Sequence, residues 1–320
     1  MKLKFDPKVL SINSKKINFW LTDFKLKFFE IKNLKIEKDK TQNKKRALKI
    51  SFFVFLVIIS ACWIFPFGLM SNVSFKDAAQ IVTNSIFALP ENRGDLFKNY
   101  ENAWEALNFV ESFFTSLIVT ILSNFFIVFL GSLAAWQLSR TKTWYSKIIF
   151  YTFLVVLIVP FQAIMLPLIT IMGKLSFLNI PGLIFMYTGF GLSLSIFMMH
   201  GFMNTVPISL EEAAQVEGYN PLRIYFKIIL PLLKPVITTI VILNTMWIWN
   251  DFLLPYLVFT QNSNALTTIV VNLYTKLVGT YGTDFPSLMA GLIILIIPII
   301  IFFFIAQKNI VANITKGAIK

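Results

Sequence analysis

Long apolar stretches alternate with short polar ones along most of this chain. Six of the stretches reach about 20 residues, the length of helix that crosses a hydrocarbon layer of roughly 30 Å. They lie, to within a few residues, at 47–70, 112–136, 148–172, 182–205, 235–259 and 287–306. A closed barrel would need short alternating strands instead of these continuous runs. The pattern therefore predicts an all-α, polytopic membrane protein with six transmembrane helices.

Composition supports the same class. Of the 320 residues, 56% are hydrophobic and only 14% are charged, and the mean hydropathy is +0.71. So few polar residues cannot cover a single soluble core of this size. The sequence therefore places most of the chain in a lipid bilayer.

The net charge of +13 is unevenly distributed. Residues 1–49 hold 15 Lys and Arg against five Asp and Glu, whereas 71–111 hold three against six. Basic residues flanking spans stay on the cytoplasmic side. We therefore expect a multi-pass protein of the cell membrane, with both termini and the 137–147 turn in the cytoplasm and 71–111 outside. A charge placed beside a membrane in this way gives no reason to expect a nucleic-acid partner.

The basic extension 1–46 precedes the first apolar stretch and the region 47–320, which holds all six stretches. Its apolar residues follow spacings of three and four that suit an amphipathic helix lying on anionic lipid. These residues are Ile17, Leu21, Phe24, Phe28 and Ile31. Residues 24–28 also alternate like a strand, so a surface helix and a loosely ordered tail both remain open.

Residues 209–231, between the fourth and fifth stretches, carry clear helix-end signals. Ser209 and Glu212 have the spacing of a capping box, and Gly218 suits a left-handed helix end. Asn220 can cap a second helix that has Pro221 at its first position. We therefore predict two short helices joined by a tight turn, with Pro231 ending or kinking the second.

A helix of two turns is not stable alone in water, so the first of these must pack on something. Leu210, Ala213 and Ala214 would give it a small apolar face, while Glu211 and Glu212 would offer carboxylates to a basic partner. These features fit a coupling element that docks on another protein. They fit equally an ordinary turn that packs on its own helical bundle.

Seven positions in this segment match the EAA loop of ATP-binding cassette (ABC) importer permeases. They are Glu212, Ala213, Ala214, Gly218, Ile228, Leu230 and Pro231. Further matches within 47–320 lie at 160–167, 249–252, 288–291 and 315–320. Together these motifs resemble the second, six-helix permease of maltose-type carbohydrate importers. Glu217, where the family usually has Asp, and Tyr219, where a small residue is common, depart from its pattern.

This resemblance implies a type I ABC importer permease-like bundle that forms half of the path for a carbohydrate. Its expected partners are an ABC ATPase dimer, a second permease subunit and an extracellular substrate-binding lipoprotein. The resemblance also implies that the loop 209–231 sits in a groove of the ATPase, where Glu212 pairs with a basic residue. The ATPase would bind ATP and Mg²⁺, and this chain would carry no cofactor and would not itself be an enzyme.

Asp251 is the one acid inside a predicted span, and intramembrane acids are functional candidates by default. Asn244, Trp247 and Asp251 would share one face of the fifth helix. The candidate pathway-lining residues are Asn244, Trp247, Asn250, Asp251, Gln162 and Asn124. For each, packing against a neighbouring helix is the alternative.

Other chemistry is missing from the sequence. Cys62 and His200 are the only residues of their kinds, which leaves no set of thiolate or imidazole ligands for a metal. No Gly-x4-Gly-Lys-Ser/Thr motif occurs, so we expect the energy to come from a partner. The alternatives to a sugar importer are an ion-coupled secondary transporter, for which only Asp251 is available, and an importer of glycerol 3-phosphate.

Overall fold

The computed structural model describes residues 44–91, 97–260, 266–279 and 282–318. Most of the 1–46 extension therefore lies outside the described residues. The chain divides into two compact units, Met1–Gly68 and Leu69–Lys320. The first apolar stretch belongs to a helix at Lys44–Ser74, which is long and apolar enough to cross a membrane.

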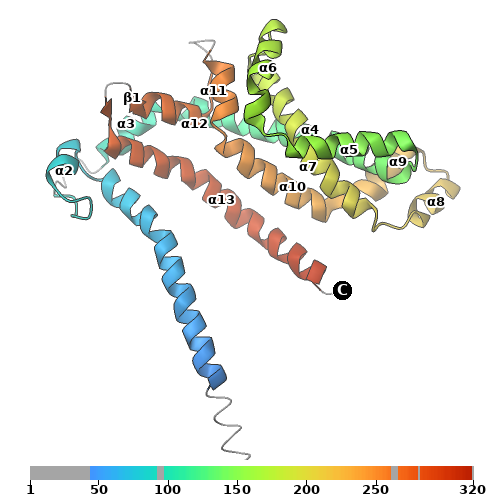
Figure 1. The fold of residues 1–320 in the computed structure, drawn as a ribbon, viewed down its shortest axis with the longest axis horizontal. Coiled ribbons are helices and arrows are strands. Elements are labelled where there is room, and N and C mark those ends of the chain that lie inside the picture. Colours follow the sequence, from blue (N-terminus) through green and yellow to red (C-terminus); the bar gives the residue numbers. More distant parts are fainter. Residues whose placement is uncertain (1–43, 92–96, 261–265, 280–281, 319–320) are drawn as a thin grey trace, which may run out of the picture. The chain divides into compact units, whose positions relative to one another are not determined.

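The second unit is almost entirely helical (Figure 1). Before the 209–231 segment its helices are α2 (Ala78–Thr83), α3 (Lys98–Ala106), α4 (Phe109–Arg140), α5 (Trp144–Ile158), α6 (Phe161–Lys174) and α7 (Ile180–Met203). After them come α8 (Ser209–Val216), α9 (Pro221–Ile224), the π-helical turn η1 (Tyr225–Ile229), α10 (Leu230–Asn250) and α11 (Leu253–Phe259). The unit ends with α12 (Ile269–Asn272), the π turn η2 (Leu273–Leu277), an antiparallel pair β1 (Val278–Gly279) and β2 (Gly282–Thr283), and α13 (Phe285–Ala318).

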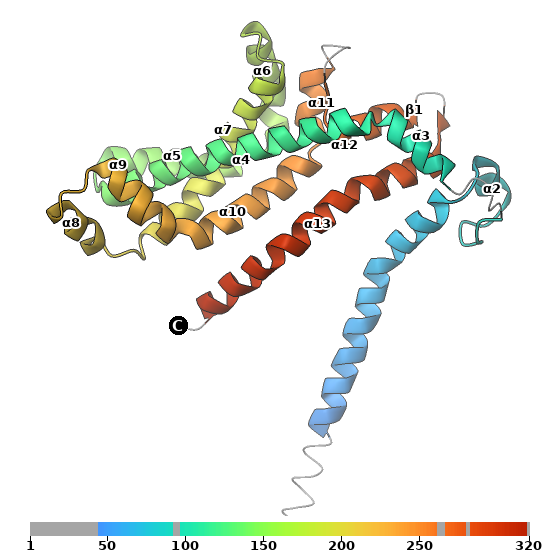
Figure 2. The same ribbon diagram turned by 180° about the vertical axis from the view of Figure 1, so that it is seen from behind.

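Helices α4, α7 and α10 form the centre of the unit and lie side by side in both ribbon views (Figures 1 and 2). Small residues let α4 and α7 approach closely. A Cβ atom at Gly131 would lie 3.5 Å from Cβ of Ser195, and one at Gly191 would lie 2.4 Å from Cδ1 of Ile127. Such small-residue contacts are typical of helices that pack inside membranes.

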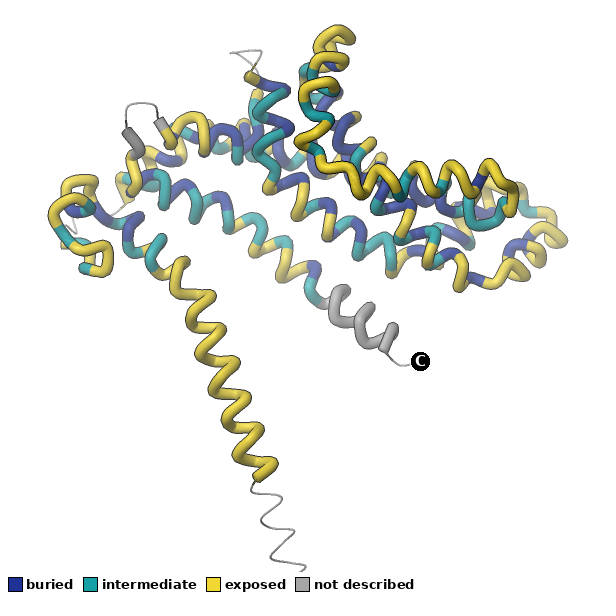
Figure 3. The backbone as a smooth tube through the Cα atoms, in the orientation of Figure 1, coloured by how far each residue is buried: buried dark blue, intermediate teal, exposed yellow. Residues whose placement is uncertain are grey.

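The surface of this unit is strongly apolar. The outward faces of α5 and α6 are largely exposed, whereas α4 and α7 carry buried stripes (Figure 3). A soluble protein rarely leaves so much contiguous apolar surface uncovered. Within the described residues, five helices are long and apolar enough to cross a membrane, and the bent pair of α5 and α6 brings the number to six if it counts as one span.

The predicted third span, 148–172, is not one straight helix. Helix α5 ends at Ile158, α6 begins at Phe161, and the two axes differ by 106°. Pro160 lies between them and holds Val159 in an extended conformation, with ψ of 117°. A residue before proline avoids helical geometry because the proline ring would clash with it, so the apolar run continues while the helix does not.

The predicted fifth span, 235–259, is also interrupted. Helix α10 ends at Asn250, and Asp251 is extended, with ψ of 129°. The Asp251 carboxylate accepts a hydrogen bond of 3.1 Å from the backbone N–H of Leu253, in the first turn of α11. Asp251 therefore lies at a break between two helices. In a continuous helix the N–H of Leu253 would bond a backbone carbonyl four residues earlier, and here the Asp251 side chain accepts it instead.

Candidate functional site

Helix α8 begins one residue earlier than its sequence signal predicts. Ile208 already has helical angles, and its carbonyl accepts bonds from the N–H groups of Glu211 and Glu212, at 2.9 and 3.1 Å. No side chain caps this end. The predicted capping box of Ser209 and Glu212 is therefore wrong, because Ser209 is inside the first turn and not before it.

The other end of α8 follows the prediction. Gly218 has φ of +84°. The N–H of Tyr219 bonds the carbonyl of Ala214 at 3.0 Å, and that of Gly218 bonds Gln215 at 2.9 Å. These two bonds define a Schellman motif, which needs a left-handed residue at the glycine position. A Cβ atom at Gly218 would meet nothing within 4 Å, so backbone conformation alone selects glycine here.

The second helix starts as predicted but does not stay short. The side chain of Asn220 accepts a 2.8 Å bond from the N–H of Arg223, and Pro221 occupies the first turn. The helix then continues through η1 into α10, and the whole helical segment spans Pro221–Asn250. Pro231 has no N–H and its ring crowds the carbonyl four residues earlier. The wider π turn before it accommodates this clash, so the proline neither ends the helix nor isolates the loop.

The two neighbouring carboxylates of α8 have different environments. Glu212 is exposed, whereas Glu211 is only 5% exposed. Glu211 accepts bonds from Nε of Arg140 at 2.8 Å and from the indole N–H of Trp136 at 2.9 Å, and Nη2 of Arg140 lies 2.7 Å from the same carboxylate. The interpretation that Glu211 is offered to a basic partner is therefore corrected, because Arg140 of the same chain already neutralises it.

The three small apolar residues of α8 do not share a face. Ala214 is buried against Ile224 and Tyr225, while Leu210 and Ala213 are exposed. Toward the end of the helix, Val216 is 90% exposed. Of the remaining motif positions, Ile228 and Leu230 are half-buried and Pro231 is exposed. We call the exposed side chains of Leu210, Glu212, Ala213 and Val216 the outer face of α8.

Helix α4 also contacts η1, the turn that follows α8 and α9 in the loop. The Tyr225 hydroxyl of η1 lies 2.6 Å from that of Ser132, and its ring stacks on Trp136 with centroids 5.9 Å apart. Sequence reasoning did not find Ser132, Trp136 or Arg140. They lie in a predicted span and its flanking turn, and no local pattern connects them with residues more than 70 positions later.

The polar residues near the end of α10 are divided between several environments. Asp251 accepts a 2.9 Å bond from the hydroxyl of Tyr187 in α7, and Trp247 packs edge-on against the same ring, at 5.4 Å. Asn244 is buried, and its amide lies 3.4 Å from the Ser195 hydroxyl. Asn250 is exposed and bonds the carbonyl of Met246 at 2.6 Å. The structure therefore does not gather Asn244, Trp247 and Asp251 on one free face.

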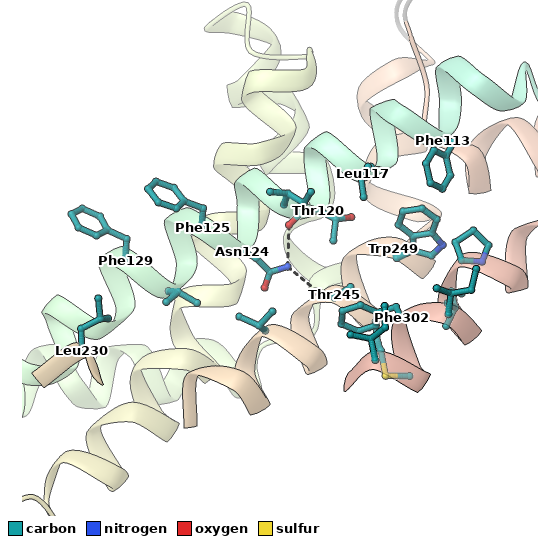
Figure 4. Close-up of a pocket in the computed structure, with 18 of the residues that line it drawn as sticks. Phe113, Leu117, Thr120, Asn124, Phe125, Phe129, Leu230, Thr245, Trp249 and Phe302 are labelled. Atoms are coloured by element: carbon teal, nitrogen blue, oxygen red, sulfur yellow. Dashed lines mark hydrogen bonds between the residues drawn. The ribbon is translucent and has the colours of Figure 1, made fainter. Parts of the chain in front are cut away.

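The remaining two candidates, Gln162 and Asn124, lie in different environments. Gln162 is exposed on the first turn of α6. Asn124 lies on α4 at the wall of a cavity of about 840 Å³ between α4, α10 and α13 (Figure 4). Its side-chain amide donates to the carbonyl of Thr120 at 3.0 Å and to the hydroxyl of Thr245 at 3.2 Å.

This cavity is lined mainly by aromatic and aliphatic side chains, with a few polar ones. The lining side chains labelled in Figure 4 are Phe113, Leu117, Thr120, Asn124, Phe125, Phe129, Leu230, Thr245, Trp249 and Phe302. The polar members are uncharged. A space of this size and lining suits an apolar helix or a neutral molecule better than an ion.

The comparisons with known proteins fit this geometry. Residues 127–316 match the family model described as the inner membrane component of binding-protein-dependent transport systems. The chain belongs to this family. The match spans α8 and the helices on both sides of it, so the predicted family resemblance is confirmed, and members of this family are transport permeases and not enzymes.

Individual relatives extend the match beyond the family model. The probable starch degradation products transport system permease protein AmyC of Thermoanaerobacterium thermosulfurigenes is 40% identical over 265 residues, covering 82% of this chain and 94% of that protein. The multiple sugar-binding transport system permease protein MsmG of Streptococcus mutans is 33% identical over 284 residues, covering 86% of this chain and all of the relative.

The fold has a solved counterpart. A chain in the crystal structure of a bacterial ABC transporter that imports the acidic polysaccharide alginate matches with a TM-score of 0.69 and 22% identity, over 82% of this chain and 96% of that one. At this identity the likeness concerns the fold alone. It confirms the predicted all-α permease architecture.

Proposed function

We propose that this chain is a permease subunit of an ABC importer and forms half of the membrane path for a neutral carbohydrate. The substrate class is inferred from two relatives: AmyC is a probable permease for starch degradation products, and MsmG is a permease of a multiple sugar-binding transport system. Both are matched over nearly their whole length. The membrane-embedded helices and the exposed α8 loop are the parts that such a subunit needs.

The outer face of α8 is the proposed docking surface for an ATPase. Leu210 and Val216 are apolar side chains left exposed on a helix of only eight residues, which by itself has little helical stability. A partner that covers these side chains would remove them from water. Glu212, exposed beside them, would pair with a basic residue of the groove. ATP and Mg²⁺ would be bound by the ATPase dimer.

The membrane side of the proposal concerns the cavity between α4, α10 and α13. We propose that a second permease subunit covers this opening and that Asn124 contributes to the wall of the path. Thr245 gives this largely apolar wall a hydroxyl, and the aromatic rings of the lining suit the apolar faces of sugar rings. Gln162, Trp247 and Asn250, all exposed, are further candidates for contact with the path or with the second subunit.

The orientation and outer partner follow from the same assignment. With α8 on an ATPase, both termini lie in the cytoplasm, and the segment with α2 and α3 lies outside, where a substrate-binding lipoprotein would dock. Glycerol 3-phosphate is a poorer substrate for this chain, because its phosphate would require basic groups and the polar side chains of the described cavity are uncharged. An ion-coupled carrier is not favoured by any relative.

The test is affinity purification of the tagged chain from its native membrane in mild detergent, with identification of the bound proteins. We expect an ATPase, a second permease and a binding lipoprotein. The purified complex, reconstituted in liposomes with the binding protein, should accumulate radiolabelled maltooligosaccharides only when ATP is supplied on the ATPase side. Accumulation by the chain alone, without ATP, would overturn the proposal.

A further inference from the structure

One stripe of residues on α4 contacts both α8 and η1, which lie on the two sides of the turn at Gly218. Ser132, Trp136 and Arg140 are spaced by four residues, so they lie on the same face of the helix. Trp136 and Arg140 reach Glu211 in α8, and Ser132 and Trp136 contact Tyr225 in η1. Trp136 therefore belongs to both contacts, through its N–H on one side and its ring on the other.

Arg140 joins three helix ends at a single guanidinium. It is the last residue of α4, and it pairs with Glu211 in the first turn of α8. Its Nη2 donates to the carbonyl of Val206 at 3.0 Å, and its Nη1 donates to that of Met203, the last residue of α7, at 3.4 Å. A positive group at these carbonyls interacts favourably with the negative end of the α7 dipole.

The ion pair of Arg140 and Glu211 is shielded enough from water to hold the two helices in a fixed position. The side chains of Arg140 and Glu211 are 18% and 7% exposed. Exposed ion pairs are weak and change partners readily, whereas breaking a buried one leaves an uncompensated charge. The planar fork of arginine also fixes direction as well as distance, which an ammonium group would not do.

We propose that the stripe of Ser132, Trp136 and Arg140 transmits movement of α8 directly to α4, and that Glu211 is the positioning residue that makes this possible. The inference rests on the proposed function, in which α8 docks on an ATPase. Without the stripe, a movement of α8 would reach the other helices mainly through the chain segments that connect it to α7 and to η1. With the stripe, α8, α4 and the start of α10 move as one body, since a coupling contact must not slip.

The adjacent carboxylates provide a matched pair of variants. Glu211→Gln removes the charge that holds Arg140 and leaves the outer face of α8 unchanged. Glu212→Gln makes the same chemical change one residue on, at the exposed surface. The first should loosen α8 from α4, and the second should weaken docking while α8 stays fixed.

The first measurement is the distance distribution between spin labels at Lys142, just after α4, and Val216, at the end of α8. Both side chains are exposed, and Cys62 is replaced by Ser beforehand. In the full chain in lipid nanodiscs, we expect one narrow distribution for the parent and for Glu212→Gln, and a broadened one for Glu211→Gln and Arg140→Lys. A narrow distribution in all four would overturn the proposal.

The second measurement is sugar transported per ATP hydrolysed, in the reconstituted complex with its ATPase, companion permease and binding protein. For Glu211→Gln we expect the ATPase to remain bound and this ratio to fall at least about fivefold, the low end of typical coupling between distant sites. An unchanged ratio would overturn the proposal. Trp136→Phe keeps the ring on Tyr225 and loses only one bond to Glu211, so it should fall between the parent and Glu211→Gln, and it replaces Glu211→Gln if that variant does not assemble.

The two proposals fail in different ways. If no ATPase binds the parent chain, the proposed function is wrong, and the spin-label result still reports whether Glu211 fixes α8. If the ATPase binds and drives transport but Glu211→Gln couples as well as the parent, only the role of the stripe is wrong.

Discussion

The hydroxyl of Tyr187 donates a hydrogen bond of 2.9 Å to the carboxylate of Asp251. Tyr187 is fully buried in α7, and Asp251 lies at the break between α10 and α11. Because the same carboxylate accepts the N–H of Leu253, it holds α7 and the start of α11 together. The acid that the sequence marks as a pathway candidate thus already has structural partners within the chain.

Tyr187→Phe should therefore destabilise the protein. The change leaves the ring in place and removes one partner of a shielded carboxylate, which costs about 1–3 kcal/mol. Thermal unfolding of the detergent-solubilised chain measures the effect. Tyr256→Phe, on half-buried α11, removes a hydroxyl that makes no hydrogen bond within the described residues, and it should shift the midpoint little. Equal shifts for the two variants would contradict the assignment.

Gly191→Ala should disturb the contact between α4 and α7. The added Cβ would lie 2.4 Å from Cδ1 of Ile127, so the isoleucine or the helices must move, at a cost of about 1–3 kcal/mol. Gly189→Ala, in the same helix with nothing within 4 Å of its Cβ position, is the control. Adding Ile127→Ala to Gly191→Ala should cost less than the sum of the single changes. Strict additivity in the unfolding measurements would show that the two residues do not meet.

Gly218→Val should weaken the end of α8, because a side chain in the left-handed region costs roughly 1–2 kcal/mol. Gly218→Asn should be milder, since asparagine tolerates that conformation. Gly201→Ala, inside α7 with open space around it, should be neutral or slightly stabilising. Hydrogen exchange of the α8 amides measures local opening, and we expect it to rise in the order parent, Asn, Val. Identical exchange in the parent and Gly218→Val would refute the role of the glycine.

Glu212→Lys should reduce recovery of the ATPase in the affinity purification, because it reverses a charge on the outer face of α8. Glu212→Gln should reduce it less. Glu105→Lys makes the same reversal on exposed α3, at a helix distant in sequence from α8, and should leave recovery unchanged. If Glu212→Lys retains a full complement of ATPase, the docking role of this residue is wrong.

Local chemistry predicts the end of α8 and the start of α9 better than it predicts their surroundings. Gly218 and Asn220 act on backbone groups two to four residues away, so the pattern around them contains the needed information. Glu211 and Glu212 look equivalent in sequence. Only the tertiary contact with α4 distinguishes them, because Arg140, which pairs with Glu211, lies 71 residues earlier in the chain.

The span boundaries show a similar limit. Hydropathy detects the apolar runs around Pro160 and Asp251 but not the helix breaks there, because apolar residues continue on both sides. The proline and the carboxylate change backbone geometry without changing the average polarity of the run. Length and composition thus predicted how many apolar segments exist, and single residues decided which of them are straight.

The corner between α5 and α6 has a consequence for what surrounds the protein. The carbonyls of the last turn of α5 have no amide partners within their helix, and Ile158 at this corner is 81% exposed in the isolated chain. In hydrocarbon each unbonded carbonyl would cost several kcal/mol. Fatty acyl chains are therefore poor neighbours for this corner, and it is wetted or covered by another subunit wherever it lies at membrane depth. The bend thus marks a position on the chain that water or protein, and not lipid, must surround.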